Sequence, residues 1–275
     1  MAALRVVAVS AVAFSAVVGV VAATRQDAAP EPAPSRRACA YAAHSLAALG
    51  RFEEALGAPV DCALVYNDVA VAWADWEQPW FTKRPKADED WVAWRAAAPG
   101  RSLIISQSLV AAGELDGDWR AQGAAGAYDE HYRVLARNLV AAGLGTSVIR
   151  LAPEANDTAN PNHIGRSDAE IADWRALWAR AVAAMRSVDG ARFRFDWCVN
   201  AYWEPIPFER WYPGDASVDV IGVDVYDNGI APGPERWRRI RERAASVDAI
   251  VAFARARDRP LSVPEWALVP PDQGG

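Results

Sequence analysis

Residues 147–156 have the sequence SVIRLAPEAN, which sets the pattern for the rest of the chain. The apolar run at residues 147–151 is typical of a buried strand, and it ends at once in polar residues. Further on, Ser167 and Glu170 form a capping-box motif, in which each side chain covers a free backbone N–H group, so a helix is predicted to begin there. A second apolar run follows at residues 193–199. Strand, helix and strand in this order predict a parallel βαβ unit.

The same alternation continues on both sides of this unit. The other predicted strands lie at residues 38–43, 62–66, 103–107, 218–225 and 261–263, and further helices at residues 46–56, 128–142 and 234–257. Parallel strands need right-handed crossovers, which helices provide. Seven such units favour the (β/α)8 barrel over an open doubly wound sheet. No Gly-x-Gly-x-x-Gly motif follows a strand, so the usual dinucleotide site is not indicated.

An eighth strand is missing from the predicted series, because residues 271–275 fall where the loop after strand seven should be. We therefore expect an α/β fold of the TIM-type (β/α)8 barrel class that lacks its eighth strand in this chain. The barrel domain is predicted to span residues 38–275 and to be truncated at its C-terminus. Its first and seventh strands would then have exposed edges, which favour aggregation.

The composition excludes several kinds of partner. The chain has 275 residues, 52% of them hydrophobic, which is enough for one sizeable core. Its formal charge of −6 argues against nucleic acid and against an anionic membrane surface. Cys39, Cys62 and Cys198 lack the spacing of metal ligands, and no histidine accompanies them, so we expect no metal and no cofactor. Nothing in the sequence implies a protein partner, and a monomer is expected.

The N-terminal residues predict export. Residues 1–23 fit a signal peptide, with Arg5 before an apolar run that ends in small residues. An uncleaved membrane anchor is the alternative. Residues 24–37 form a Pro/Ala-rich linker. Both interpretations put the barrel outside the cytoplasm, so we expect a secreted protein. Export permits a disulfide between Cys39 and Cys62 if their strands are neighbours, and three buried thiols are equally compatible with the sequence.

Two glutamates follow strands whose C-terminal ends should meet. Active sites of β/α barrels lie at this end, where Glu154 follows the strand at residues 147–151 and Glu265 follows the strand at residues 261–263. Facing carboxyl groups are what glycosidic cleavage needs, because one must be protonated to assist the leaving oxygen and the other must be ionised. Arg150 could face the same side, where it would either keep Glu265 ionised or form a buried ion pair inside the barrel.

Further residues near the strand ends are candidate substrate contacts, because aromatic rings offer an apolar face and amides bond hydroxyl groups. They are Asn156, Trp197, Asn200, Trp203 and Trp266. Asn156 could instead turn its loop. Trp73, Trp76 and Trp80 would share one face of a helix, where they would form either a sugar platform or a packed cluster.

Three segments at the predicted strand ends are residues 148–156 (VIRLAPEAN), 218–226 (VDVIGVDVY) and 260–268 (PLSVPEWAL). They resemble strands four, six and seven of glycoside hydrolase family 26, which contains β-mannanases and related β-glycanases. The resemblance extends thinly over residues 38–270. It implies a retaining barrel enzyme, with Glu154 as the acid/base, Glu265 as the nucleophile and Tyr226 as the tyrosine that contacts the nucleophile. Pro153 departs from the family, whose mannanases usually have His at that position.

The predicted function is therefore a secreted, retaining, endo-acting β-glycoside hydrolase that cleaves a polysaccharide such as β-mannan. A retaining mechanism predicts carboxyl groups about 5–5.5 Å apart. The alternative is a catalytically inactive carbohydrate-binding protein on the same fold, because fold does not guarantee function. A metal-dependent hydrolase is disfavoured, since the chain has 3 histidines and no His-x-His pair.

Overall fold

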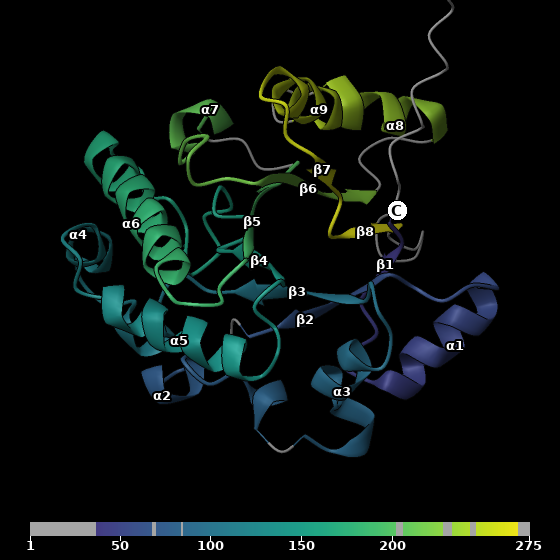
Figure 1. Cartoon of the computed structure of the whole chain (residues 1–275). Helices are drawn as coiled ribbons and strands as arrows, with labels where there is room; N and C mark the ends of the chain where they lie inside the picture. Colours follow the sequence, from purple (N-terminus) through teal and green to yellow (C-terminus); the bar gives the residue numbers. More distant parts are fainter. Residues whose placement is uncertain are drawn as a thin grey trace, which may run out of the picture. The chain divides into compact units, whose positions relative to one another are not determined.

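One curled parallel sheet organises the chain (Figure 1). The computed structural model describes residues 37–67, 70–83, 85–201, 206–227, 233–242 and 246–268, so the predicted signal peptide and nearly all of the predicted linker lie outside the described residues. Strands follow one another across the sheet in chain order, each parallel to its neighbour. Their bounds are β1 (Cys39–Ala40), β2 (Cys62–Tyr66), β3 (Ser102–Gln107), β4 (Val148–Leu151), β5 (Arg194–Asn200), β6 (Val220–Asp227), β7 (Leu261–Ser262) and β8 (Trp266–Leu268).

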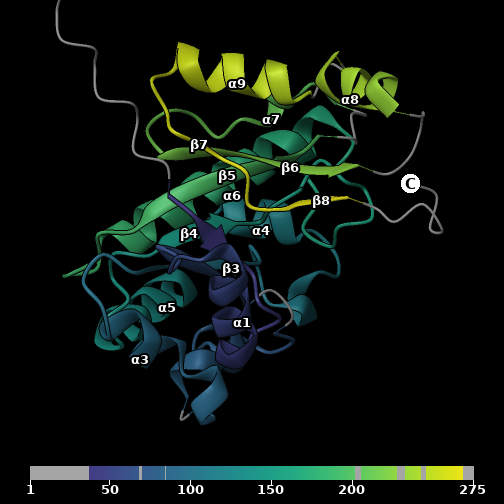
Figure 2. The same ribbon diagram turned by 90° about the vertical axis from the view of Figure 1, so that its right-hand side faces the viewer.

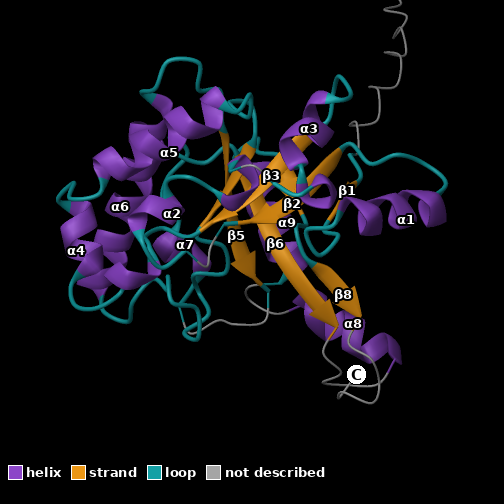
Figure 3. Cartoon of the chain, turned by 90° about the horizontal axis from the view of Figure 1, so that it is seen from below, coloured by secondary structure: helices purple, strands orange, loops and turns teal. Residues whose placement is uncertain are grey.

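Helices surround the strands, as the purple and orange elements of Figure 3 show. They are α1 (Leu46–Leu56), α2 (Trp73–Trp76), α3 (Trp91–Ala96), α4 (Trp119–Ala124), α5 (Asp129–Ala141), α6 (Asp168–Arg186), α7 (Phe208–Trp211), α8 (Gly233–Glu242) and α9 (Val247–Ala256), with 3₁₀ turns η1 (Trp80–Thr82), η2 (Ala87–Glu89) and η3 (Ala112–Glu114). This arrangement explains the continuous apolar strands, because both faces of the sheet are covered. The capping box of Ser167 and Glu170 is present at the start of α6.

The segments β7 and β8 occupy one strand position beside β6, which Figure 2 shows as a continuous yellow trace. Gly222 pairs with Ser262 and Val225 pairs with Trp266, so the outer strand advances by four residues while β6 advances by three. One extra residue on one strand of a pair is a β-bulge, which bends the strand and redirects a side chain. The described residues therefore form seven strand positions and no eighth, as expected, and the bulge falls at Glu265.

The predicted strands and long helices are present, with differences at both ends of the sheet and with short helices α2, α3, α4 and α7 that were not predicted. The first strand, expected at residues 38–43, is reduced to Cys39–Ala40. Residues 234–257 were expected to form one helix, and the structure has α8 and α9 instead. The cause is Ser246, whose side chain accepts a hydrogen bond from the backbone N–H of Ala249 and so starts a new helix. The short segment β8, which continues the strand beyond Glu265, was not predicted.

A disulfide joins Cys39 of β1 to Cys62 of β2, which are register partners. This settles the choice that the sequence left open, and Cys198 stays a buried free thiol. The strand β1 forms only two residue pairs with β2. The disulfide therefore supplies much of the attachment of the first strand to the sheet.

In the part of the chain that the structure describes, none of the helices combines the length and the apolarity needed to cross a membrane.

Removing the disulfide should destabilise the fold strongly. Closing a loop of 23 residues lowers the entropy of the unfolded chain, which corresponds to about 3 kcal/mol of stability. We expect the double variant Cys39→Ala, Cys62→Ala to lose about this much free energy of unfolding in urea titrations. Cys198→Ala is a poor control because Cys198 contacts Arg150. The control is the reduced wild-type protein, whose free energy of unfolding should equal that of the double variant. A loss below about 1 kcal/mol would contradict the account.

Candidate active site

The ends of three strands bring three carboxyl groups together. Glu154 follows β4, Asp224 lies on β6, and Glu265 lies in the bulge between β7 and β8. One carboxylate oxygen from each lies within 4.8 Å of those of the other two. Inverting glycosidases hold their carboxyl groups about 6.5–9.5 Å apart, and retaining ones about 5–5.5 Å apart. The nearest oxygens of the predicted pair therefore approach each other more closely than the carboxyl groups of an inverting site do.

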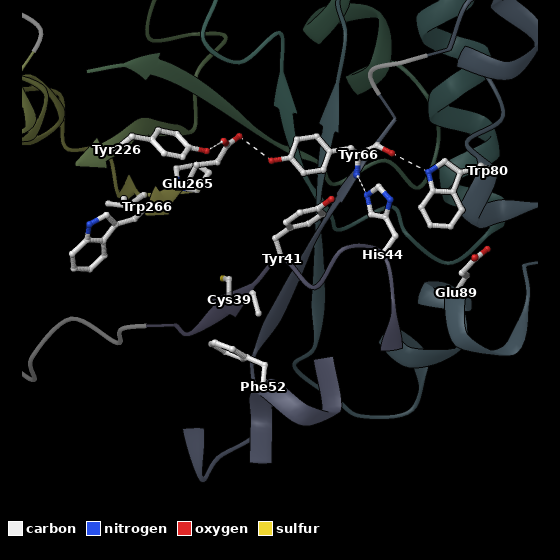
Figure 4. A pocket seen from close by; sticks show the side chains of 13 residues that line it. Cys39, Tyr41, His44, Phe52, Tyr66, Trp80, Glu89, Tyr226, Glu265 and Trp266 are labelled. Atoms are coloured by element: carbon white, nitrogen blue, oxygen red, sulfur yellow. Dashed lines mark hydrogen bonds between the residues drawn. The ribbon is translucent and has the colours of Figure 1, made fainter. Parts of the chain in front are cut away.

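Glu265 is held by three side chains and by its own backbone, and Figure 4 shows two of these side chains, Tyr66 and Tyr226. Its Oε1 accepts hydrogen bonds from Arg150 at 2.6 Å and from the Tyr66 hydroxyl at 2.8 Å, and its Oε2 accepts one from the Tyr226 hydroxyl. Its backbone N–H donates to Asp224 at 3.0 Å. Burial raises the pKa of Glu265, but the charge of Arg150 and the hydroxyl donors outweigh burial and leave the pKa below its ordinary value. Glu265 is therefore ionised at neutral pH.

Arg150 is the only described cation in direct contact with these carboxylates, and it is fully buried. One guanidinium nitrogen bonds Glu265, and the other bonds Asp224 and contacts the Cys198 sulfur at 3.8 Å. Both sequence-based interpretations of Arg150 hold, because it is a buried ion-pair partner and it also lowers the pKa of Glu265. Its charge lies where a cation would bind the same carboxylates, so the site is already neutralised in part without a metal.

Glu154 sits in a strained loop. Its φ is 53° and that of Ala152 is 45°, both in the left-handed region that side chains disfavour. Such residues cost about 1–3 kcal/mol each and concentrate at functional sites. The backbone N–H of Glu154 donates to the Cys198 carbonyl at 3.0 Å, and that of Ala152 donates to the Gln107 carbonyl at 2.7 Å. The flanking strands thus hold the loop in a shape that brings Glu154 toward Glu265.

The pKa of Glu154 is raised, mainly by burial and then by the charge of Glu265, while Arg150 and a hydrogen bond with Asp224 act in the opposite direction. Its Oε1 is buried and has no hydrogen-bond partner among the described residues. Three carboxyl groups share one guanidinium, so a proton is favoured on one of them. Burial also raises the pKa of Asp224, against the opposing charge of Arg150. The proton is therefore favoured on Glu154 or Asp224 over Glu265, whose pKa is lowered.

A groove of about 1130 Å³ opens beside Glu265. Its lining is mostly aromatic and apolar, and Glu89 and Glu265 are its two charged residues. The rings that line it are Tyr41, His44, Phe52, Tyr66, Trp80, Tyr226 and Trp266. Trp266 is 70% exposed at its edge. The rings provide flat apolar faces of the kind that pack against sugar rings.

The other predicted contacts differ in where they lie. Trp266 lines the groove, as expected. Asn156 is buried, and its side chain exchanges hydrogen bonds with the backbone N–H and carbonyl of Asn200, so these two residues join the loops after β4 and β5. The structure does not bring Trp197 to the site: it is fully buried against Trp211, Tyr212 and Phe253, because the packing under α7 and α9 takes its ring.

Trp203 lies outside the described residues.

The three tryptophans after β2 were predicted to form either a sugar platform or a packed cluster, and the structure divides them between the groove and the packed interior. Trp76 is fully buried, Trp73 stacks on His131 at 3.9 Å between ring centroids, and Trp80 lines the groove. They are not on one helix face, because α2 ends at Trp76 and Trp80 begins η1.

Tyr66 and Asp224 are site residues that the sequence alone did not single out. Tyr66 is the last residue of β2, and Asp224 interrupts the apolar run of β6. A polar residue at a strand's C-terminal end was the available signal for both.

Comparisons with known proteins support the fold and a family resemblance. The model of Glycosyl hydrolase family 26 matches residues 163–260. A mannanase of Bacillus subtilis aligns with 84% of this chain and 79% of its own, at 13% identity and a TM-score of 0.51. A modular endo-β-1,4-mannanase of Cellulomonas fimi aligns with 78% of this chain and 51% of its own, at 17% identity and a TM-score of 0.57. The family 26 domain of a Prevotella bryantii endo-β-mannanase/endo-β-glucanase aligns with 84% of this chain and 75% of its own, at 15% identity and a TM-score of 0.53. No curated protein matches the sequence.

Fold and site together define a β/α-barrel protein with a glycosidase-type pair of carboxyl groups. Within that class, residues 163–260 match the model of glycosyl hydrolase family 26, and the low identities to solved members of that family mark the chain as divergent from them.

Glu154→Gln should stabilise the fold at neutral pH. Because the folded pKa of Glu154 is raised, the folded state loses stability as the pH rises from the unfolded pKa to the folded one. Gln cannot ionise, so the gain in free energy of unfolding should be absent near about pH 3, grow above the ordinary pKa of a glutamate, and then level off. Urea titrations at a series of pH values measure it.

The matched control is Glu265→Gln. The folded pKa of Glu265 is lowered, so its charged form stabilises the fold above its unfolded pKa, and this stability is lost as the pH falls. We expect this variant to be less stable than wild type at neutral pH by about 2 kcal/mol, since hydrogen bonds to a charged group are lost. A Glu154→Gln protein that is less stable than wild type at pH 7 would contradict a raised pKa of Glu154.

Proposed function

We propose that the chain is a retaining β-glycoside hydrolase with Glu265 as nucleophile and Glu154 as acid/base. The observation that carries the proposal is the pair itself: two carboxyl groups with oxygens within 4.8 Å, one with its pKa lowered and the other with its pKa raised. Environments that push two carboxyl pKa values apart are what acid and base roles require. The spacing leaves little room for the water that an inverting mechanism places between substrate and base.

In the first step, Glu265 attacks the anomeric carbon and the bond to the leaving oxygen breaks, while Glu154 gives that oxygen its proton. The product is a covalent glycosyl-enzyme. In the second step, Glu154, now ionised, takes a proton from water, whose oxygen displaces Glu265 from the anomeric carbon. Arg150, Tyr66 and Tyr226 keep the attacking carboxylate ionised and oriented.

The proposed substrate is a polysaccharide such as β-mannan, cleaved in endo fashion. The groove of about 1130 Å³ and its exposed ring at Trp266 support binding of a sugar chain. The similar solved structures of Bacillus subtilis and Cellulomonas fimi are described as mannanases, and one from Prevotella bryantii is described as an endo-β-mannanase/endo-β-glucanase. Pro153 precedes the proposed acid/base Glu154, where mannanases of the family usually have His. The contact to the cleaved sugar at this position should therefore differ from theirs.

We also propose that the protein acts outside the cytoplasm. The Cys39–Cys62 disulfide supports this location, because disulfides persist mainly in oxidising compartments.

Azide should distinguish the roles of the two carboxyl groups. With an aryl glycoside, Glu154→Ala should still form the glycosyl-enzyme, and azide should then displace Glu265 and give a glycosyl azide of retained configuration. In Glu265→Ala, azide should attack the anomeric carbon directly and give the inverted azide. Both variants should lose at least about a thousandfold in kcat without azide. NMR of the product configuration is the measurement, and exchanged stereochemistry between the variants would reverse the assignment.

A substrate panel separates an enzyme from an inactive carbohydrate-binding protein. Mannan, mixed-linkage glucan, xylan and arabinan are incubated with the protein, and new reducing ends are counted. We expect release from at least one β-linked polysaccharide and none from the Glu154→Ala, Glu265→Ala double variant. Binding to one of them without release of reducing ends would favour the inactive protein.

A further inference from the structure

The backbone of Tyr66 faces a gap in the sheet. The next residue, Asn67, donates its N–H to Ser106 of β3. Backbone groups of successive strand residues point to opposite sides, so the N–H and carbonyl of Tyr66 point away from β3, toward β1. The strand β1 has already ended at Ala40, which pairs with Ala63. The sheet therefore offers Tyr66 no strand partner on this side.

Two side chains bond these groups instead (Figure 4). The Nε2 atom of His44 accepts the Tyr66 N–H at 3.1 Å, and Nε1 of Trp80 donates to the Tyr66 carbonyl at 2.9 Å. His44 comes from the loop after β1, and Trp80 comes from η1 after β2. These are the places of the ladder bonds that a longer β1 would have made. Both backbone groups of a residue that contacts Glu265 are thus held by aromatic side chains.

His44 is built into this position. Its φ is 60° and that of Ala43 is 48°, so the chain turns through two left-handed residues to present the ring. The ring packs against Trp80 at 5.0 Å and against Tyr41 at 5.4 Å between centroids. The geometry requires the tautomer with its proton on Nδ1, because Nε2 must accept.

The charge state of His44 agrees with this role. Burial lowers the pKa of His44, and the charge of Glu89 raises it to a smaller extent. The rings packed against His44 are those of Tyr41, Tyr66 and Trp80. A neutral ring leaves Nε2 available as an acceptor.

We propose that His44 is a positioning residue for the nucleophile: by accepting the backbone N–H of Tyr66, it holds the Tyr66 hydroxyl on Oε1 of Glu265. The proposal rests on the proposed function only in naming Glu265 the nucleophile. His44 acts through Tyr66, so its effect should require the Tyr66 hydroxyl.

A double-mutant cycle tests this dependence. Tyr66→Phe and His44→Phe should each lower kcat by about tenfold, because each removes or displaces one charge-assisted hydrogen bond, and should change KM by less than about twofold. In the Tyr66→Phe background, His44→Phe should lower kcat by less than about twofold. His44→Gln, whose amide oxygen can occupy the place of Nε2, should retain most of kcat. Fully additive losses, or a His44→Gln loss equal to that of His44→Phe, would overturn the proposal.

A titration makes the test independent of turnover. The hydroxyl of Tyr66 donates to the charged form of Glu265, so its displacement should raise the pKa of Glu265. We expect ¹³C NMR of the Glu265 carboxyl to show a higher pKa in His44→Phe than in wild type, and no further rise when His44→Phe is added to Tyr66→Phe. If the wild-type protein cleaves no glycan, the proposed function is refuted. The NMR titration of the Glu265 carboxyl still decides the role of His44 in that case, because it does not depend on turnover.

Folding of the variants is controlled by a second substitution. Asn tolerates the left-handed backbone of residue 44 but is too short to reach the Tyr66 N–H, so His44→Asn should reproduce the pKa rise of His44→Phe with a native thermal unfolding transition. A folded His44→Asn protein with the wild-type pKa at Glu265 would overturn the proposal.

Discussion

The site depends on one charge imbalance: a single buried guanidinium, Arg150, faces three carboxyl groups. Taking Arg150 out of water is costly, and its ion pairs with Asp224 and Glu265 offset that cost. Three ionised carboxyl groups would leave two negative charges in excess, so a proton on one of them is favoured, and Glu154 is the carboxyl that Arg150 does not bind directly. The same arrangement therefore lowers the pKa of Glu265 and leaves that of Glu154 raised, which are the directions that the nucleophile and the acid of a retaining glycosidase need.

Backbone geometry brings these groups together. The bulge between β7 and β8 adds one residue opposite β6, so Glu265 bonds Asp224 through its N–H and Val225 through its carbonyl while its side chain meets Arg150. The loop in which Ala152 and Glu154 have left-handed conformations brings the side chain of Glu154 toward the same group of charges. Both features are locally unfavourable, and neighbouring strands hold them in place through backbone hydrogen bonds.

Much of this could be predicted from the sequence, because strand and helix periodicity and the capping box of Ser167 and Glu170 are local signals. The pairing of Glu154 with Glu265 followed from the rule that strand ends meet. Tyr66 and Asp224 could not be placed in the same way, because their contacts depend on register and side-chain direction. Trp197 shows the converse: a tryptophan near a strand end was assigned to the substrate, but its large apolar body is fully buried in the core.

Trapping the covalent intermediate tests the central claim most directly, namely that Glu265 is the nucleophile and Glu154 the acid. A 2-deoxy-2-fluoro glycoside with a good leaving group slows both steps, and the leaving group lets the first step proceed, so the glycosyl-enzyme accumulates. Peptide mass spectrometry then identifies the labelled residue. The account predicts one glycosyl group per chain, attached to Glu265, and no adduct in Glu265→Gln. An adduct on Glu154, or hydrolysis with inverted configuration and no adduct, would contradict it.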